Sequence, residues 1–187
     1  MAGIENLEEF VRSAASVQAV AFAAACTERA APILFWVVSA DGRTSDLETY
    51  ASALDVLWSP NNLTSEQFIE RRERIVLMQE LAVGDDVIGA RAFAYQGAVA
   101  LHTALGVPAG LGGTVLHDCS STLRNFSFRL ERRCNTRLLD EEDEIQRQDI
   151  ADLTAVDGDA DAQLMEQRQR AAALGRKWLA LAVERFG

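Results

Sequence analysis

The segment from Gln18 to Trp58 reads QAVAFAAACTERAAPILFWVVSADGRTSDLETYASALDVLW, and it decides the fold class. Its first half is a long apolar run rich in alanine, the residue with the highest helix propensity. Glu28, Arg29 and Pro32 interrupt this run, and a second apolar helical pattern then leads to Trp58. The segment therefore predicts two packed helices, with charged residues where the surroundings must otherwise be buried.

The composition of the whole chain supports the same fold class. The chain has 187 residues, of which 49% are hydrophobic, and only three are proline. This length fits one domain, and the scarcity of β-branched runs favours helix over sheet. We expect residues 1–187 to form a single all-α domain, a bundle of about seven to eight helices.

Capping residues and turns locate the expected helices. Ser16 is an expected N-cap, because its hydroxyl can accept a hydrogen bond from the first turn. Ser45 with Glu48, and Thr64 with Gln67, have the spacing of capping boxes. The expected helices are Ile4–Ala15, Ser16–Val38, Ser45–Trp58, one that opens at Thr64 and extends to Ala82, Val87–Leu105, Thr114–Asn135, one that starts in the acidic run at Asp140, and Ala162–Phe186.

The segment Val87–Leu105 is expected at the centre of the bundle. It is rich in glycine and alanine, among them Gly97 and Ala98. Small side chains allow two helix axes to approach closely, so this helix should have the nearest neighbours.

The charge balance excludes several classes of partner. Lysine and arginine total 18 against 28 aspartates and glutamates, so the formal net charge is -10 and the pI is about 4.7. Such a chain is poorly suited to neutralise phosphates, so we expect neither nucleic acid nor an anionic membrane as its partner. An acidic exterior instead favours the approach of a basic protein.

Three features indicate a cytoplasmic protein. Cys26, Cys119 and Cys134 form no C-x-x-C pair and are expected to be reduced thiols. The N-terminal residues lack the basic and apolar regions of a signal peptide. Glu28 and Arg29 interrupt the longest apolar run, so we expect no membrane span.

The two histidines give no clear catalytic or metal site. His102 and His117 are too few for a typical zinc site. The run His117–Ser121 brings a base, an acid and three nucleophiles together in sequence, but a triad needs converging geometry. A helix cap or a hydrogen-bonded core polar group is the better interpretation, and no catalytic residue, metal ligand or cofactor is predicted.

Asp157, Asp159 and Asp161 are spaced like the start of a calcium-binding EF-hand loop. Ala162 stands where that loop needs glycine, and Arg168 stands where it needs the bidentate glutamate. We therefore expect a solvated acidic loop before the last helix.

Glu28, Arg29 and Asp55 are expected to form a structural polar link. A buried charge needs a partner, because otherwise its pKa shifts until it is neutral. Since Asp55 lies one turn before Trp58, we hypothesise an ion pair between Arg29 and Asp55 that joins the second helix to the third.

Two motifs carry a family resemblance. The sequence E-R-x-x-P at residues 28–32, followed by L-D-x-L-W at residues 54–58, resembles the YjaG-like family of uncharacterised bacterial helical proteins (domain of unknown function 416). The similarity extends through Y-Q-G-A at residues 95–98 and the acidic C-terminal third. This chain departs from the family at Thr27, where cysteine is usual, and at Ala30–Ala31, where bulkier residues are usual. The resemblance implies a compact all-α domain and supplies no catalytic residues.

Three functions fit these observations. The first is a non-enzymatic protein that acts by protein-protein interaction, such as an immunity-type inhibitor of a basic toxin. The second is a self-associating protein that uses Val107–Val115 or the last helix as an interface. The third is a ligand-binding domain or enzyme with an inter-helix pocket near Glu28, Asp55 and His102. For the first, the expected partner-binding residues are the two acidic clusters, Asp140, Glu141, Glu142, Asp143 and Glu144, and Asp157, Asp159 and Asp161.

Overall fold

The computed structural model describes residues 4, 6–59, 63–83, 87–155 and 160–187, and every regular element among them is a helix. The expected all-α, single-domain bundle is confirmed, with nine helices along this part of the chain instead of seven to eight. They are α1 (Leu7–Ser13), α2 (Ser16–Ala40), α3 (Thr44–Leu57), α4 (Ser65–Val76), α5 (Gln79–Val83), α6 (Ala90–Ala104), α7 (Val115–Cys134), α8 (Leu139–Thr154) and α9 (Ala160–Phe186).

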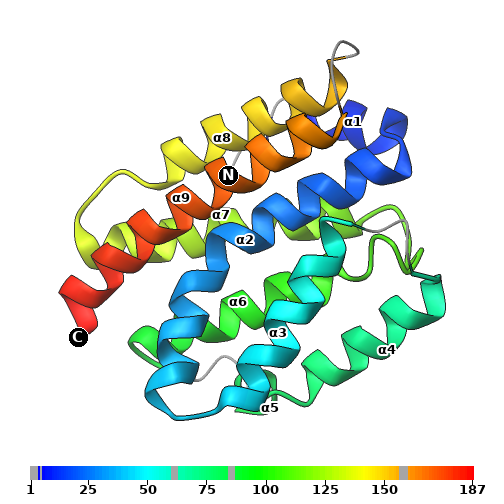
Figure 1. Cartoon of the computed structure of the whole chain (residues 1–187). Helices are drawn as coiled ribbons and strands as arrows, with labels where there is room; N and C mark the ends of the chain where they lie inside the picture. Colours follow the sequence, from blue (N-terminus) through cyan, green and yellow to red (C-terminus); the bar gives the residue numbers. More distant parts are fainter. Residues whose placement is uncertain (1–3, 5, 60–62, 84–86, 156–159) are drawn as a thin grey trace.

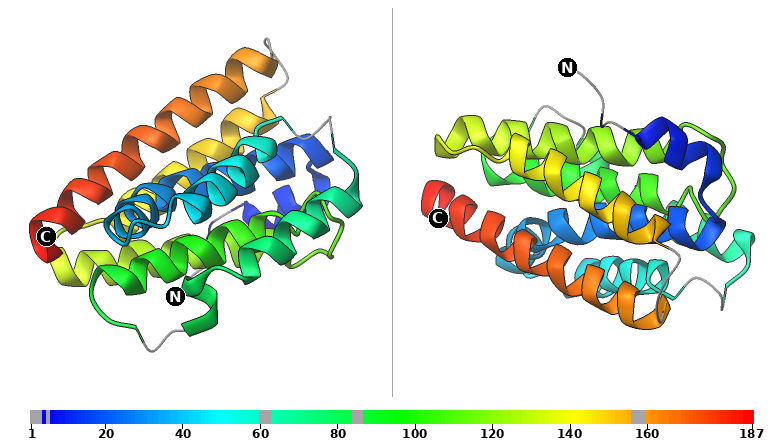
Figure 2. Two further views of the ribbon diagram at one scale, coloured as in Figure 1. Left: turned by 60° about the horizontal axis from the view of Figure 1, so that its bottom comes forward. Right: turned by 90° about the horizontal axis from the view of Figure 1, so that it is seen from above.

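Helix α2 forms the centre of the bundle, because its alanine-rich sequence is apolar around most of its circumference. It contacts α3, α6, α7, α8 and α9 and crosses the molecule diagonally in Figure 1. Figure 2 shows it enclosed between α9 on one side and α6 and α7 on the other. It is long and apolar enough to cross a membrane, but most of its apolar stretch is buried in the bundle, which is consistent with the core helix of a soluble protein.

Helix α6 packs closely on α2, as its small residues predict. A Cβ atom on Gly97 would lie 3.2 Å from Leu34 Cβ, so even alanine would be tight there. The hydroxyl of the fully buried Tyr50 donates a hydrogen bond to the Gly97 carbonyl oxygen at 3.0 Å, which adds α3 to the same contact.

Helix α9 approaches the backbone of α2 next to Pro32. Proline carries no N–H, so the Glu28 carbonyl oxygen, four residues earlier, loses its usual helical donor. A Cβ atom on Gly175 would lie 2.8 Å from the Arg29 carbonyl oxygen and 3.0 Å from Pro32 Cγ. Only glycine therefore allows α9 to pass α2 at this distance.

The capping box at Thr64 is confirmed, and the one at Ser45 is wrong. Thr64 Oγ1 accepts from the Gln67 N–H at 3.3 Å, and Gln67 Oε1 accepts from the Thr64 N–H at 2.9 Å. Helix α3 instead begins at Thr44, with Arg43 at the N-cap and no side-chain cap bond. The guanidinium group of Arg43 only donates hydrogen bonds and so cannot cap N–H groups; it forms ion pairs with Asp46 and Glu80.

Two other expected boundaries also differ. Ala15, and not Ser16, is the N-cap of α2, because its N–H donates to Gln18 Oε1 at 2.7 Å. The helix expected from Thr64 to Ala82 divides into α4 and α5 at Leu77, the C-cap of α4.

Candidate functional site

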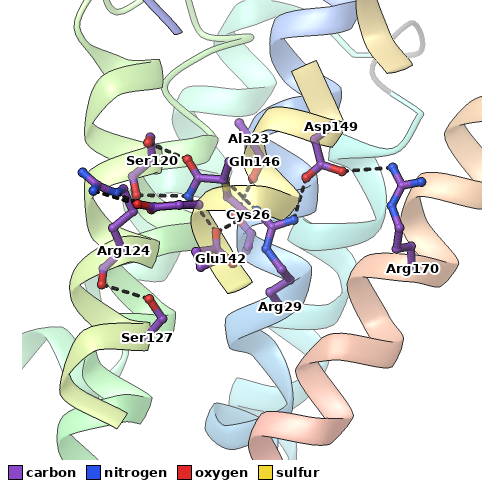
Figure 3. Close-up of polar contacts among 12 residues, drawn as sticks. Ala23, Cys26, Arg29, Ser120, Arg124, Ser127, Glu142, Gln146, Asp149 and Arg170 are labelled. Atoms are coloured by element: carbon purple, nitrogen blue, oxygen red, sulfur yellow. Dashed lines mark hydrogen bonds and ion pairs between the residues drawn. The ribbon is translucent and has the colours of Figure 1, made fainter. Parts of the chain in front are cut away.

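Arg29 lies at the centre of a buried polar network and is fully inaccessible to solvent. Its Nη1 donates to Asp149 Oδ2 at 2.7 Å, and its Nη2 donates to Glu142 Oε1 at 2.9 Å. Figure 3 shows the guanidinium group of α2 directed at the two carboxylates of α8. The expectation that at least one of Glu28 and Arg29 is partly buried agrees with the structure, and the partners of Arg29 are Glu142 and Asp149.

Polar side chains of two further helices extend this arrangement. Gln146 Nε2 donates to Glu142 Oε1 at 2.6 Å, and Ser120 Oγ of α7 donates to Gln146 Oε1 at 2.6 Å. Arg170 of α9 donates to Asp149 Oδ1 at 3.2 Å. We call Arg29, Ser120, Glu142, Gln146, Asp149 and Arg170 the Arg29 network; it joins α2, α7, α8 and α9 (Figure 3).

The charged side chains of the Arg29 network pair with one another. Burial lowers the pKa of Arg29, but Glu142 and Asp149 outweigh this effect, so the pKa rises above its ordinary value and the side chain stays charged. Burial raises the pKa of Glu142, and Arg29 and Gln146 counteract only part of that rise. Arg170 also pairs with Asp152 of α8 at 2.6 Å, so two guanidinium groups face three carboxylates and tie the helices together.

The predicted ion pair between Arg29 and Asp55 is wrong. Asp55 is exposed and pairs with Arg168 of α9. Glu28 also turns to this side: its Oε2 accepts from Trp58 Nε1 at 2.9 Å and lies 3.5 Å from Arg168 Nε. Because neighbouring residues on a helix point in different directions, Glu28 and Arg29 serve separate contacts.

The residues of the predicted inter-helix pocket take part in two different sets of contacts. Glu28 and Asp55 meet at Arg168. His102 is half-buried on α6, where its carbonyl oxygen accepts from Arg72 Nε at 3.2 Å. Burial and the nearby Arg72 lower the pKa of His102, so its imidazole is neutral around neutral pH.

The run His117–Ser121 contributes to the core. Cys119 is buried, and burial raises its thiol pKa well above the ordinary value. Ser120 is the hydrogen-bonded core polar group of this run, through its bond to Gln146. Among the residues that the structure describes, no group of three or more histidine, cysteine, aspartate or glutamate side chains could hold a metal ion.

The first acidic cluster is mostly engaged within the protein. Glu142 is completely buried, so its predicted role as a surface contact is wrong. Glu141 pairs with Lys177 at 2.6 Å, Asp143 with Arg124 at 2.6 Å and Glu144 with Arg147 at 2.7 Å. The first two of these pairs join α8 to α9 and α7, the third lies within α8, and the run also begins α8 as the sequence predicts.

The remaining predicted contacts divide between exposed and undescribed positions. Asp140 and Asp161 are exposed at the first turns of α8 and α9. Asp157 and Asp159 lie outside the described residues.

The sequence interpretation did not identify Ser120, Gln146, Asp149 and Arg170 as members of the buried network. One signal was available: residues 142, 146 and 149 are spaced to share one face of a helix. A polar residue at each position of the stripe that faces the core indicates a buried polar partner.

Comparison with known proteins adds no relative: the chain matches no family model, no curated protein and no solved structure. The resemblance to the YjaG-like family therefore stays a prediction.

Proposed function

We propose that the protein acts by binding another protein through its acidic exterior, and that the partner is basic. The narrower form of this proposal is an immunity-type inhibitor that neutralises a basic toxin in the cytoplasm. The Arg29 network supports a non-enzymatic role, because its carboxylates and guanidinium groups are engaged with one another. The surface that we propose as the contact with the partner lies on helix α4.

The outer face of α4 carries the proposal. Glu66, Glu70 and Glu73 follow one another at intervals of four and three residues, so they share one face of the helix. All three side chains are exposed. They form no ion pair among the described residues, unlike the carboxylates at the start of α8.

Apolar side chains lie beside these glutamates. Ile69, Val76 and Leu77 are 37%, 46% and 81% exposed, and the helical spacing places them on or next to the same face. Solvent-exposed apolar residues with a charged border are typical of protein interaction sites. We call Glu66, Ile69, Glu70, Glu73, Val76 and Leu77 the α4 face.

Two of the three arginines of α4 are tied to the bundle, and the third, Arg74, is exposed one turn after Glu70. Arg72 Nε donates to the His102 carbonyl oxygen at 3.2 Å, and Arg71 Nη1 donates to Ser52 Oγ at 3.2 Å. Phe68 and Ile75 anchor the opposite side of the helix in the core. The α4 face is therefore held in one orientation, which lowers the entropy cost of binding.

A capture experiment from the native host tests the proposal. The wild-type chain and the variant Glu66→Gln/Glu70→Gln/Glu73→Gln are used as baits, and a captured protein is then purified and titrated by calorimetry. We expect a basic partner whose affinity for the variant falls by about tenfold or more. We also expect that this partner alone arrests growth when expressed and that the wild-type chain relieves the arrest.

The matched control changes the same charge elsewhere. Glu8→Gln/Glu9→Gln/Glu184→Gln removes three exposed carboxylates from α1 and α9 and should retain the wild-type affinity. Equal loss in both variants would indicate a general charge effect, and unchanged affinity in the α4 variant would refute the α4 face as the contact. A captured partner that is not toxic would agree with the protein-binding role and would refute the immunity-type role.

A further inference from the structure

An arginine-lined groove opens between the start of α6 and the C-terminal half of α7. Its volume is about 620 Å³. The α6 side includes Ile88 and Phe93, and the α7 side includes Phe128, Arg129, Arg132 and Arg133. We call these six residues the arginine groove. None of them belongs to the α4 face, so this site is independent of the proposed function.

The helical period places the α7 residues of the groove together. Arg132 follows Phe128 by four residues and Arg129 by three, and Arg133 follows Arg129 by four, so each pair lies one helical turn apart. Three guanidinium groups therefore line one wall of a groove in a protein whose formal net charge is -10.

Two of these arginines are positioned by uncharged groups, and neither pairs with a carboxylate in the part of the chain that the structure describes. With the Gln96 side-chain oxygen directed at the guanidinium group, Arg129 Nη1 lies 3.0 Å from that oxygen. Arg132 Cζ lies 5.8 Å from the centre of the Phe128 ring, within the range of a cation–π contact. An amide and an aromatic ring orient the cations and leave their positive charge available.

The neighbouring arginine on the same helix behaves differently. Arg124 binds both carboxylate oxygens of Asp143, at 2.6 and 3.1 Å. Arg129, Arg132 and Arg133 form no such pair with any carboxylate among the described residues. The uncompensated positive charge of α7 is thus concentrated at the groove.

The walls of the groove combine this charge with apolar surface. Phe93 is buried at its inner side, and Ile88 is 86% exposed at its outer side. Phe128 lies between the arginines and is partly exposed. A ligand that matches this groove carries carboxylates for the guanidinium groups and an apolar group for the rings.

We propose that the arginine groove binds an acidic peptide segment of another protein, with its carboxylates on Arg129, Arg132 and Arg133 and an apolar side chain against Phe128 and Ile88. A peptide fits better than a small molecule, because small-molecule pockets enclose most of the ligand surface and this groove has highly exposed walls. A short acidic peptide carries fewer negative charges than a nucleic acid, so the strongly acidic remainder of the chain repels it less.

Selection from a random library of phage-displayed 12-residue peptides tests the proposal with the full chain as the target. The variant Arg132→Gln/Arg133→Gln removes two groove charges. Arg12→Gln/Arg176→Gln is the matched control, with the same change in net charge at exposed positions on α1 and α9. Circular dichroism verifies that all three proteins are folded.

The expected result has two parts. Peptides enriched on the wild-type chain carry two or more aspartates or glutamates next to a leucine, isoleucine or aromatic residue. The best of them, synthesised with a fluorescein label, binds the groove variant at least about tenfold more weakly than it binds the wild type and the control in an anisotropy titration.

Three results would overturn the proposal. If the enriched peptides have no acidic bias, or if no peptide is enriched, the proposal that an acidic segment binds the groove is refuted. Equal affinity for the groove variant and the control would remove the groove as the binding site. Tighter binding of a fluorescein-labelled 12-nucleotide RNA through Arg132 and Arg133 would replace the peptide by nucleic acid.

Discussion

Arg29 and Glu142 are 113 positions apart in the chain, yet Arg29 Nη2 and Glu142 Oε1 lie 2.9 Å apart and neither side chain is exposed to solvent. Asp149, which lies on the same helix as Glu142, is the second ion-pair partner of Arg29. A buried charge that loses its partner is costly, whereas an intact buried pair need not stabilise a protein more than apolar residues would. This asymmetry leads to the first prediction.

Replacement of Arg29 by leucine should strongly destabilise the fold. The substitution leaves Glu142 and Asp149 buried without their main countercharge, and the expected loss in the free energy of unfolding is about 3–5 kcal/mol. Urea denaturation followed by circular dichroism measures it. Arg176→Leu, at an exposed position on α9, should change the same quantity by about 0.5 kcal/mol or less.

Removal of the two carboxylates should rescue this variant. Arg29→Leu/Glu142→Leu/Asp149→Leu is expected to be more stable than Arg29→Leu alone, because no unpaired buried charge remains. In the native network, Arg29 Nε and Glu142 Oε2 are buried without a hydrogen-bond partner, so the polar arrangement already carries a cost. Wild-type stability in Arg29→Leu would contradict the structural role of the network.

Glu28 should make stability depend on pH. Burial raises its pKa, and the hydrogen bond from Trp58 and the charge of Arg168 offset only part of the rise. The folded state therefore binds the proton more tightly, so this contribution to stability is complete below the unfolded pKa of about 4.3 and is lost as the pH rises through the folded value. The free energy of unfolding of the wild type, relative to that of Glu28→Gln, should decrease as the pH rises from about 4 to about 7.

Urea titrations of both proteins at several pH values measure this difference. Glu66→Gln, the same substitution at an exposed position of α4, serves as the matched control. A wild type that gains stability relative to Glu28→Gln as the pH rises would show that the partners of Glu28 outweigh its burial.

Replacement of Gly175 by alanine should separate α9 from α2. The added methyl group would lie 2.8 Å from the Arg29 carbonyl oxygen, and backbone at that position cannot yield as a flexible side chain does. Overpacking of this kind costs about 1–3 kcal/mol, measured by urea denaturation. Gly113→Ala is the matched control, because no atom lies within 4 Å of its added Cβ; an equal loss in both variants would refute the steric explanation.

The three thiols should differ in reactivity. Cys26 and Cys119 are buried, and burial raises the pKa of each thiol, which disfavours the reactive thiolate. Cys134 is partly exposed. Iodoacetamide at neutral pH should therefore modify Cys134 first, and the other two only after unfolding in urea.

Mass spectrometry of the intact protein counts the adducts, and peptide mapping locates them. Cys134→Ser should remain unmodified under native conditions. Rapid native labelling of Cys26 would mean that α2 opens readily, which its central position in the bundle argues against.

Much of the fold could be predicted from the sequence because it depends on local signals. The apolar period of α2, the small residues around Gly97 and the Thr64–Gln67 capping box are each readable within a short segment. The Ser45–Glu48 spacing does not mark the helix start, because α3 begins at Thr44 with Arg43 at the N-cap. Helix α4 likewise ends at Leu77, inside a helical pattern of apolar residues that continues in the sequence.

The Arg29 network was only half predictable. A charge between Ala25 and Ile33 in an apolar run signals burial by itself. Its partners lie on a helix whose acidic start already has a local explanation in the helix dipole, so nothing in the segment indicates that Glu142 points inward. Asp55 was predicted as the partner of Arg29 because it lies on the next helix in the sequence. In the fold, α8 packs on α2 and supplies the partners of Arg29, and Asp55 pairs with Arg168.

The position of Arg29 has a consequence for biosynthesis. At about 5–20 residues per second, the ribosome adds Glu142 roughly 6–23 seconds after Arg29. During this interval α2, the most apolar helix of the chain, holds a cation whose countercharges have not yet been made. The nascent chain therefore cannot complete the ion pairs of Arg29 until α8 has been synthesised.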